Sequence, residues 1–385
     1  MQRIDYLDGL RGVAAVIVVV HHVACLLCPA LFFGLEPGVS ASWQTTFAAS
    51  PLSIVINGRS AVYVFFALSG FVIAASADRT RRTLPGNVCA RVIRLGLPAS
   101  ASVILAGGLA LSGWMFPRAM LELMGNHSWL ADQHPDPTLA RWLPQIFGAY
   151  VLTRKSEFNP VLWTMQMELV GSVAIYVLFA LFREAALRIV ACLTIAVLVM
   201  ATRTEPFPYL CFCGGALLYL RCDRLTALPP AAGTLLIAAG LLCAGAPYAP
   251  VMPGGFYALP AGLLAPLGLH VTSSWTLGSV LLVGGLIASP AAQQLLSTEL
   301  PRFLGRISFS LYLVHFPLLG ILLVQLYLQL GQGSTAATFA CIALYLAAAI
   351  IAAVAFNAIV DEPAQRLSRI VGAAMPGLRL RSAGA

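Results

Sequence analysis

Repeated apolar stretches of about 20 residues constrain this chain more than any other feature. At 1.5 Å of rise per residue, a helix of that length crosses the roughly 30 Å hydrocarbon core of a membrane. The stretches are residues 10–33, 56–77, 92–113, 160–182, 187–203, 206–220, 228–246, 273–290, 308–330 and 336–359. Of all residues, 59% are hydrophobic and 10% are charged, against about 25% charged in soluble domains. Since lipid offers no hydrogen bonds to the backbone, we predict an all-α polytopic membrane protein with about ten transmembrane helices.

The positions of the basic residues predict the orientation of this bundle. Lys and Arg gather on the cytoplasmic side of membrane proteins, and a cytoplasmic N-terminus places most of the 23 basic residues there. The residues that fall elsewhere are Arg59, Arg118, Arg141, Arg154, Lys155 and Arg203. Ten spans then return the C-terminus to the cytoplasm. The net charge of +8 is then explained by basic residues at the surface of the lipid bilayer, which is the partner of this protein. No nucleic-acid partner is therefore expected.

One transmembrane domain is expected over residues 1–370, followed by a short basic cytoplasmic tail over 371–385. Residues 114–159 are polar and are predicted to form an extramembrane loop. Residues 250–271 are apolar but rich in proline. A further crossing there would move the downstream arginines to the outer side. We therefore predict a re-entrant or surface hairpin for that segment.

Ionisable side chains at membrane depth mark candidate sites, because burying them in lipid is unfavourable. In the first span, Arg11 and His22 are separated by about three helical turns, so they share one face about 16 Å apart along the axis. His21 points about 100° away from His22. An imidazole with a pKa of about 6.5 suits general-base catalysis. The alternatives are packing hydrogen bonds for the two rings and an ion pair with Asp8 for Arg11.

Arginines at the ends of the second and third spans are candidate ligands for anionic groups. Arg59 lies at the outer end of the second span, where it either snorkels to the surface or holds an anionic or hydroxylated ligand. Arg91 and Arg94 are i, i+3 at the cytoplasmic end of the third span, after Arg82. Membrane anchoring explains such arginines without any ligand, but guanidinium groups also bind phosphate.

The fourth span places a carboxylate inside the membrane. Glu168 lies about 12 Å deep from the outer side, where it must be paired or protonated. His22 and Arg59 are its predicted partners. Trp163, at the outer end of the same span, is expected in the interfacial aromatic belt.

The ninth span carries three polar residues on one face. Ser308, Tyr312 and His315 follow the i, i+4, i+7 spacing of a helix. For His315, a packing hydrogen bond ahead of Pro317 is favoured over a chemical role.

No metal site is predicted. The nine cysteines lie mostly within apolar stretches. Cys211 and Cys213 do not form a CxxC pair, and no cysteine and histidine pairs have zinc-site spacing. The cysteines are interpreted as small core residues.

Six segments, taken together, resemble one family. They are YLDGLRGVAAVIVVVHH, SAVYVFFALSGFVIA, RVIRLGLP, LWTMQMELVGS, GRISFSLYLVHFPL and DEPAQRLS, and they run from Tyr6 to Ser368. In this order they resemble the integral-membrane acyltransferase family 3, which includes O-acetyltransferases of bacterial surface polysaccharides. The family's motif of arginine, ten residues and histidine falls on Arg11 and His22, and its arginine-x-x-arginine motif falls on Arg91 and Arg94.

The resemblance implies a multi-pass enzyme of the inner (plasma) membrane with ten spans. Such an enzyme takes an acyl group, by default acetyl, from cytoplasmic acyl-CoA. It passes the group to a hydroxyl of an exported polysaccharide or of its lipid-linked precursor. Some relatives carry a further C-terminal hydrolase domain of the SGNH type, which is not expected here.

The resemblance also suggests roles for the candidate residues. The phosphates of acyl-CoA would bind Arg91, Arg94 and Arg82. The base would be His22, with Arg11 on the same face and with Glu168 orienting the imidazole as carboxylates do in serine-hydrolase triads. The residues expected to bind the acceptor are Arg59, Trp163 and His315.

Three other functions compete with this hypothesis. An acyltransferase acting on a macrolide or another small molecule differs only in the acceptor. A transporter or flippase of lipid-linked sugars would show charge pairs between broken helices at the membrane midplane. A structural scaffold would leave His22 and Glu168 unexplained.

Overall fold

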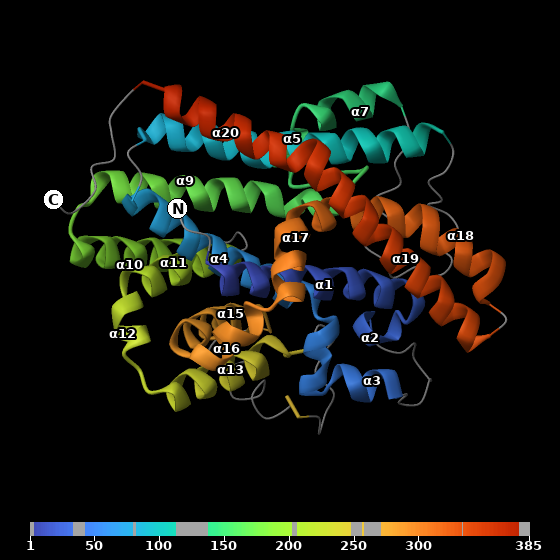
Figure 1. Cartoon of the computed structure of the whole chain (residues 1–385), viewed down its shortest axis with the longest axis horizontal. Coiled ribbons are helices and arrows are strands. Elements are labelled where there is room, and N and C mark those ends of the chain that lie inside the picture. Colours follow the sequence, from blue (N-terminus) through green and yellow to red (C-terminus); the bar gives the residue numbers. More distant parts are fainter. Residues whose placement is uncertain are drawn as a thin grey trace.

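The computed structural model describes residues 4–33, 43–79, 82–112, 138–201, 206–247, 256–257, 271–332 and 334–376. Within these ranges all the regular elements are helices, which confirms the predicted all-α fold. The long helices are α1 (Asp5–Leu27), α4 (Gly58–Arg79), α5 (Leu84–Leu111), α9 (Thr164–Leu181), α10 (Ala185–Ala201), α11 (Phe207–Leu220), α13 (Pro230–Ala244), α15 (Val271–Ala288), α17 (Glu299–Leu318) and α19 (Thr335–Phe356). Figure 1 shows α1, α5 and α9 running along the long axis of the molecule.

Shorter helices connect and extend the long ones. Before α9 these are α2 (Ala30–Phe33), α3 (Trp43–Ala48), η1 (Pro51–Ile56), α7 (Leu139–Ile146), α8 (Ala149–Thr153) and η3 (Pro160–Trp163). After it come α12 (Cys222–Thr226), α16 (Pro290–Leu296), η5 (Leu319–Leu323), α18 (Val324–Leu326), η6 (Tyr327–Gly331), η7 (Asn357–Asp361) and α20 (Glu362–Ala374). The segments η5, η6 and η7 are π-helical turns, which continue α17 and α19 without a break.

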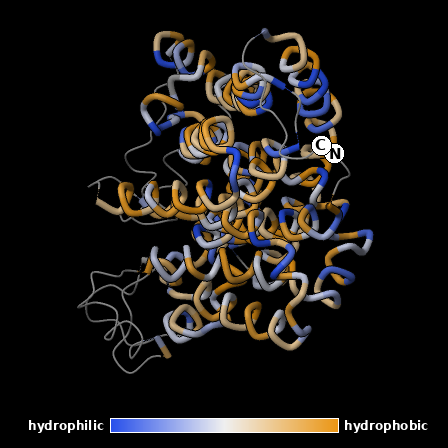
Figure 2. The backbone as a smooth tube through the Cα atoms, turned by 90° about the vertical axis from the view of Figure 1, so that its left-hand side faces the viewer, coloured by the Kyte–Doolittle hydropathy of each residue, from blue (hydrophilic) through white to orange (hydrophobic). Residues whose placement is uncertain are grey.

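Every apolar stretch marked in the sequence overlaps one of the long helices. Among the described residues, seven helices are long and apolar enough to cross a membrane, and α10, α11 and α13 are shorter apolar helices. The count of ten crossings therefore stays a prediction. Large apolar side chains such as Leu198, Phe339 and Ile351 are more than 60% exposed, and Figure 2 shows apolar positions throughout the helices. A bundle whose outer surface is apolar is suited to lipid.

Helix α4 is the centre of the bundle. Phe66, Ala67 and Ala74 are fully buried on it, and a helix that is apolar all round belongs in an interior. It packs tightly against α11, because a Cβ added at Gly70 or Gly215 would clash with the backbone of the other helix. Gly70 and Gly215 therefore allow α4 and α11 to approach closely.

Helices α1 and α17 run in the same direction and make backbone contact through glycines. An ion pair joins Asp5 to Arg302 at 3.2 Å where both helices begin. Further along, a Cβ added at Gly12 would lie 2.6 Å from the backbone nitrogen of Gly305. A Cβ added at Gly305 would clash with the carbonyl of Asp8. Small residues allow this approach between membrane helices.

We expect Gly305→Ala to lower the free energy of unfolding by about 1–3 kcal/mol, because the added methyl group forces α1 and α17 apart. Gly96→Ala is the matched control, since nothing lies within 4 Å of a Cβ added at Gly96 on α5. That change should be neutral or slightly stabilising, as alanine favours helix over glycine. Thermal unfolding of both variants in detergent tests the contact, and equal midpoints would contradict it.

The third span begins earlier than the sequence pattern predicted. Helix α5 starts at Leu84 rather than at residue 92, with the Thr83 hydroxyl accepting a hydrogen bond from the Gly86 amide at 3.1 Å. Arg91 and Arg94 therefore lie two to three turns inside α5, not at its end. A hydropathy pattern leaves charged turns out of a predicted span. The helix nevertheless continues through them, because other helices supply carboxylates to the arginines.

Several sequence predictions lie outside the described residues. These are the hairpin over 250–271 apart from residues 256, 257 and 271, most of the loop over 114–159, most of the tail over 371–385, and Arg203.

Candidate active site

A pocket with an empty volume of about 780 Å³, including the space at its mouth, lies between α1, α4, α5, α9 and α17. Its polar lining residues are Arg11, Ser69, Arg91, Arg94, Thr164, Glu168, Ser308 and Tyr312, and its apolar walls include Val62, Phe65, Phe66, Leu95 and Phe309. The five helices thus bring together polar residues that lie up to about 300 positions apart in the sequence.

Arg91 and Glu168 form the central ion pair of the pocket. Nη2 of Arg91 lies 2.5 Å from Oε2 of Glu168, and the Nε–H of Arg91 donates to the hydroxyl of Ser172 at 2.8 Å. The hydroxyl of Ser69 on α4 donates to the second carboxylate oxygen of Glu168 at 2.9 Å. Both oxygens of Glu168 therefore have partners. The sequence prediction that Glu168 pairs with His22 or Arg59 was wrong, because α5 carries Arg91 deep enough to reach the carboxylate first.

Arg94 is held by a carboxylate from the end of the chain. It forms an ion pair with Asp361 in the π-helical turn η7, and its guanidinium lies 5.2 Å from the ring centroid of Phe309. Asp361 is 1% exposed and also accepts a hydrogen bond from Gln365 at 3.2 Å. In the sequence, Asp361 stands out only as part of the DEPAQRLS segment, and its position two residues before Pro363 gives no signal of this pairing.

Arg11 lines the same pocket and is the arginine with the weakest ion pair there. Its Nη1 atom lies 3.8 Å from Oδ1 of Asp8 one turn earlier on α1, which is the helix-end pair considered from the sequence. A third of its side chain stays exposed. Arg11, Arg91 and Arg94 therefore line one pocket.

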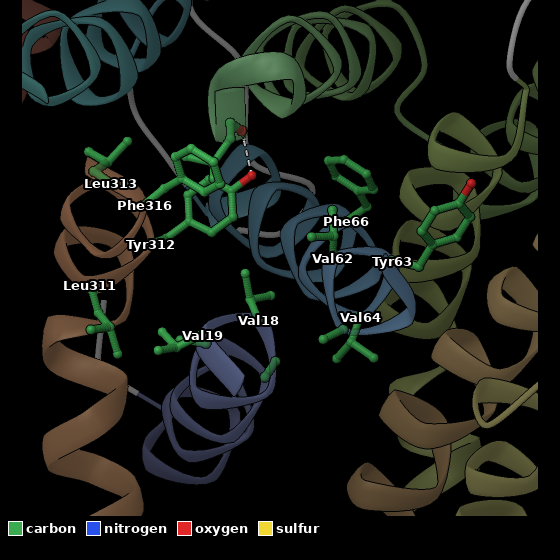
Figure 3. Packing of buried hydrophobic residues seen from close by; sticks show 14 of the residues in the cluster. Val18, Val19, Val62, Tyr63, Val64, Phe66, Leu311, Tyr312, Leu313 and Phe316 are labelled. Carbon is green, nitrogen blue, oxygen red and sulfur yellow. Dashed lines mark hydrogen bonds between the residues drawn. The ribbon is translucent and has the colours of Figure 1, made fainter. Parts of the chain in front are cut away.

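Tyr312 also lines the pocket. Its hydroxyl donates to the carbonyl of Val161 at 2.5 Å and lies 3.0 Å from the hydroxyl of Thr164. Figure 3 shows this side chain reaching from α17 toward the segment that leads into α9. Phe65 of α4 packs against the same ring, with centroids 6.4 Å apart. Tyr312 thus joins α17 to the start of α9.

His22 and His315 face each other next to Tyr312. Nδ1 of His22 lies 3.2 Å from Nε2 of His315, and the ring centroids of Tyr312 and His315 are 6.1 Å apart. His315 is fully buried. Among the described residues that line the pocket, neither histidine appears. The pair therefore lies behind the Tyr312 side of the pocket rather than on its wall.

A proline next to this pair frees a backbone carbonyl for a further contact. Pro317 has no N–H group to donate to the carbonyl of Leu313, four residues earlier. That carbonyl instead accepts a hydrogen bond from the side-chain amide of Asn159 at 2.9 Å. Asn159 also donates to the hydroxyl of Ser102 at 3.0 Å. The segment before α9 is thereby joined to both α17 and α5.

His21 has different surroundings from its neighbour. Nδ1 of His21 lies 2.9 Å from the carbonyl of Ile56, and Nε2 lies 3.6 Å from the sulfur of Cys25. The contact with Ile56 joins α1 to η1, and the contact with Cys25 stays within α1. His21 and His22 therefore have different neighbours, as expected from the 100° angular offset between consecutive residues of a helix.

Besides His315, three predicted binding residues do not line the described pocket. Arg59 is exposed at the first turn of α4, and Trp163 is partly buried at the end of η3. Arg82 precedes α5, with a hydrogen bond of 3.5 Å to the carbonyl of Arg369 on α20. Among the described residues, no group of His, Cys, Asp or Glu has the arrangement of a metal site.

The comparisons with known proteins agree with the motif-based resemblance. The Acyl_transf_3 family model, described as an acyltransferase domain, matches residues 4–357. The chain belongs to this acyltransferase family. Because the match covers nearly the whole chain, the protein is a multi-pass membrane acyltransferase, and the pocket and the histidine pair lie within its family domain.

Curated relatives of this acyltransferase come from fungi. It is 26% identical to O-acetyltransferase PaAT-1 of Phomopsis amygdali, over 83% of this chain and 72% of the relative. It is 26% identical to acyltransferase clz18 of Cochliobolus lunatus and 25% identical to acyltransferase R4 of Phoma sp.. Each of these two matches covers 81% of both chains. No solved structure matches the chain significantly.

Proposed function

We propose that this enzyme transfers an acyl group, in the first instance acetyl, from cytoplasmic acyl-CoA to a hydroxyl group that approaches from the other side of the membrane. One observation carries the proposal: a pocket with three arginines along its lining extends to Tyr312, and the His22–His315 pair lies directly behind that residue. Acetyl is the donor group to test first because one relative is named an O-acetyltransferase.

The arginines are proposed to bind the phosphates of the donor. Arg91 and Arg94 already have carboxylate partners, so a phosphate that binds them must share these guanidinium groups with Glu168 and Asp361. Arg11, with its longer contact to Asp8, offers its donors more readily. The uncharged pantetheine arm of CoA suits the apolar walls of the pocket.

His22 is proposed as the general base. It removes the proton from the acceptor hydroxyl, and the oxygen attacks the thioester carbonyl. The C–S bond then breaks, the thiolate of CoA leaves, and the imidazolium of His22 returns the proton to the sulfur. An ester and free CoA are the products. The Arg11–His22 separation of about 16 Å along α1 suits an arm that carries the thioester from the phosphates to the base.

The proposed role of Glu168 changes with the structure. The carboxylate contacts Arg91 and Ser69, so it orients a guanidinium in the pocket instead of the imidazole of His22. The neighbour of the imidazole is His315, and not the carboxylate that triad chemistry suggested.

We propose an exported polysaccharide or its lipid-linked precursor as the first acceptor class and the inner (plasma) membrane as the location. A small hydroxylated molecule such as a macrolide is the second acceptor class. Both follow from the family, and the relatives' names specify no acceptor. The transport alternative is set aside because the chain belongs to an acyltransferase family.

NMR of the purified envelope polysaccharide tests the acceptor, using cells with the gene intact, deleted, or carrying His22→Ala. We expect O-acetyl signals only with the intact gene. Unchanged signals in all three would remove the polysaccharide. The protein reconstituted in vesicles with radiolabelled acetyl-CoA and a small-molecule acceptor then tests the second class. If neither acceptor becomes labelled, and no CoA thiol is released, the donor is wrong.

A further inference from the structure

We propose that His315 is a positioning residue that, together with the carbonyl of Val18, favours the Nδ1–H tautomer of His22, so that the lone pair of the proposed base lies on Nε2. This inference rests on the proposed function, in which His22 is the base. The sequence suggested that His315 binds the acceptor. Here His315 is assigned instead to orienting the imidazole of His22.

The tautomer of His315 follows from a backbone carbonyl. Nδ1 of His315 lies 3.0 Å from the carbonyl oxygen of Leu311, one turn earlier on α17. A carbonyl oxygen can only accept a hydrogen bond, so Nδ1 carries the hydrogen. In a neutral ring the other nitrogen, Nε2, then has the lone pair. The ring is fully buried, an environment that favours its neutral form.

The tautomer of His22 follows from the carbonyl of Val18 and is reinforced by His315. Nδ1 of His22 has two acceptors within reach: the carbonyl of Val18 at 2.9 Å and the lone pair of His315 Nε2 at 3.2 Å. Two acceptors require a donor between them, so Nδ1 of His22 carries the hydrogen. The lone pair of neutral His22 is consequently on Nε2, the nitrogen that would take the hydroxyl proton.

The same contact favours the charged form that the reaction produces. When Nε2 of His22 takes the proton, the ring becomes an imidazolium and its Nδ1–H becomes a stronger donor. His315 still accepts this hydrogen bond through Nε2, because its own Nδ1–H stays on Leu311. In this respect a neutral imidazole takes the place of the carboxylate in a Ser-His-Asp triad.

The fold holds the two rings in this register. Each ring is bonded to a carbonyl of its own helix, four residues earlier, and the backbone contact of Gly12 with Gly305 fixes one helix against the other. The hydroxyl of Tyr345 on α19 also donates to the backbone carbonyl of His315 at 3.0 Å. The relative position of the rings is therefore set by three helices.

His21 shows what a structural histidine looks like on the same helix. The carbonyl of Ile56 requires its Nδ1 to carry the hydrogen, and its Nε2 lone pair is directed at the thiol of Cys25. Both tandem rings thus have the Nδ1–H tautomer, but His21 contacts Ile56 and Cys25, and not His315. His21 is therefore the natural control.

Two substitutions at His315 separate positioning from packing. His315→Leu keeps an apolar side chain of similar size without an acceptor, whereas His315→Gln keeps a carbonyl oxygen that can accept from His22. In reconstituted full-length enzyme we expect kcat to fall at least about 10-fold in the leucine variant, less than the roughly 10⁴-fold loss when the orienting carboxylate of a serine-protease triad is replaced, because the carbonyl of Val18 still accepts from His22. The KM for acetyl-CoA should stay within about 2-fold, and the glutamine variant should recover most of kcat. His21→Gln should stay near the wild-type kcat.

Nitrogen NMR of the enzyme labelled with ¹⁵N-histidine reads the tautomer directly. The chain has six histidines, and the His22 signals are assigned by their loss in His22→Gln. Wild-type His22 should show a protonated Nδ1 and an unprotonated Nε2, and the leucine variant should show a larger share of the Nε2–H tautomer, because only the carbonyl of Val18 then accepts from Nδ1. Because this measurement on the wild type needs no folded His315 variant, it decides the tautomer even if the leucine variant does not fold.

The outcomes distinguish this inference from the proposed function. A wild-type Nε2–H tautomer at His22, or a leucine variant with full kcat, overturns the role of His315 while leaving His22 as the base. Equal losses in the leucine and glutamine variants also overturn it, since they indicate packing alone. Acyl transfer that persists in His22→Ala defeats the proposed base itself, and the catalytic role of His315 with it.

Discussion

His22→Ala is expected to lower the rate of acyl transfer about 10²–10⁴-fold, the contribution typical of a general base. Without the imidazole, the acceptor hydroxyl loses its proton to water alone, and the leaving thiolate loses its proton donor. The measurement is the initial rate of CoA release from acetyl-CoA in reconstituted vesicles, with the acylated product followed by mass spectrometry.

The adjacent histidine provides the control for this prediction. His21→Ala removes a ring from the same helix, along with contacts to Ile56 and Cys25. We expect a lower unfolding midpoint in that variant with kcat changed only a few-fold. If His21→Ala were inactive and His22→Ala active, the assignment of the base would be reversed.

Glu168→Ala is expected to lower the free energy of unfolding by about 3–5 kcal/mol, because it leaves the Arg91 guanidinium buried without a carboxylate. The side chains of this pair are only 16% and 11% exposed, and Ser69 loses its acceptor as well. Chemical denaturation of the purified protein in detergent measures the loss.

A double variant isolates the interaction between the two charges. Arg91→Met combined with Glu168→Leu removes both charges and keeps apolar volume, so it should be more stable than either single variant. If the loss of stability in the double variant equals the sum of the losses in the two single variants, the two charges are not coupled in the folded protein. The double variant should also bind acetyl-CoA more weakly, because Arg91 is a proposed phosphate ligand.

Local sequence patterns were sufficient for the positions of the helices. The apolar stretches predicted the long helices, and the family motifs singled out Arg11, Arg91 and Arg94, which line one pocket. The start of α5 was missed because hydropathy averages over a window and treats a charged turn as the end of a span. In the folded chain, Glu168 and Asp361 compensate those charges, and the helix continues through them.

The partners of the buried polar groups could not be read from the sequence. Glu168 and Arg91 are 77 positions apart, and His22 and His315 are 293 positions apart. Periodicity places each side chain on a face of its own helix, but no local sequence pattern shows which faces of different helices pack together. Tyr312 was placed correctly on one face with Ser308 and His315, yet its bond to Val161 depends on how α17 meets the start of α9.

The glycine contact between α1 and α17 limits how this enzyme can move during turnover. With no side chain between the two backbones at Gly12 and Gly305, sliding one helix along the other would drive neighbouring Cβ atoms into main-chain atoms. The proposed base and the histidine proposed to orient it therefore move together. Any opening that admits the proposed donor to the pocket must come from the other helices that line it, which are α4, α5 and α9.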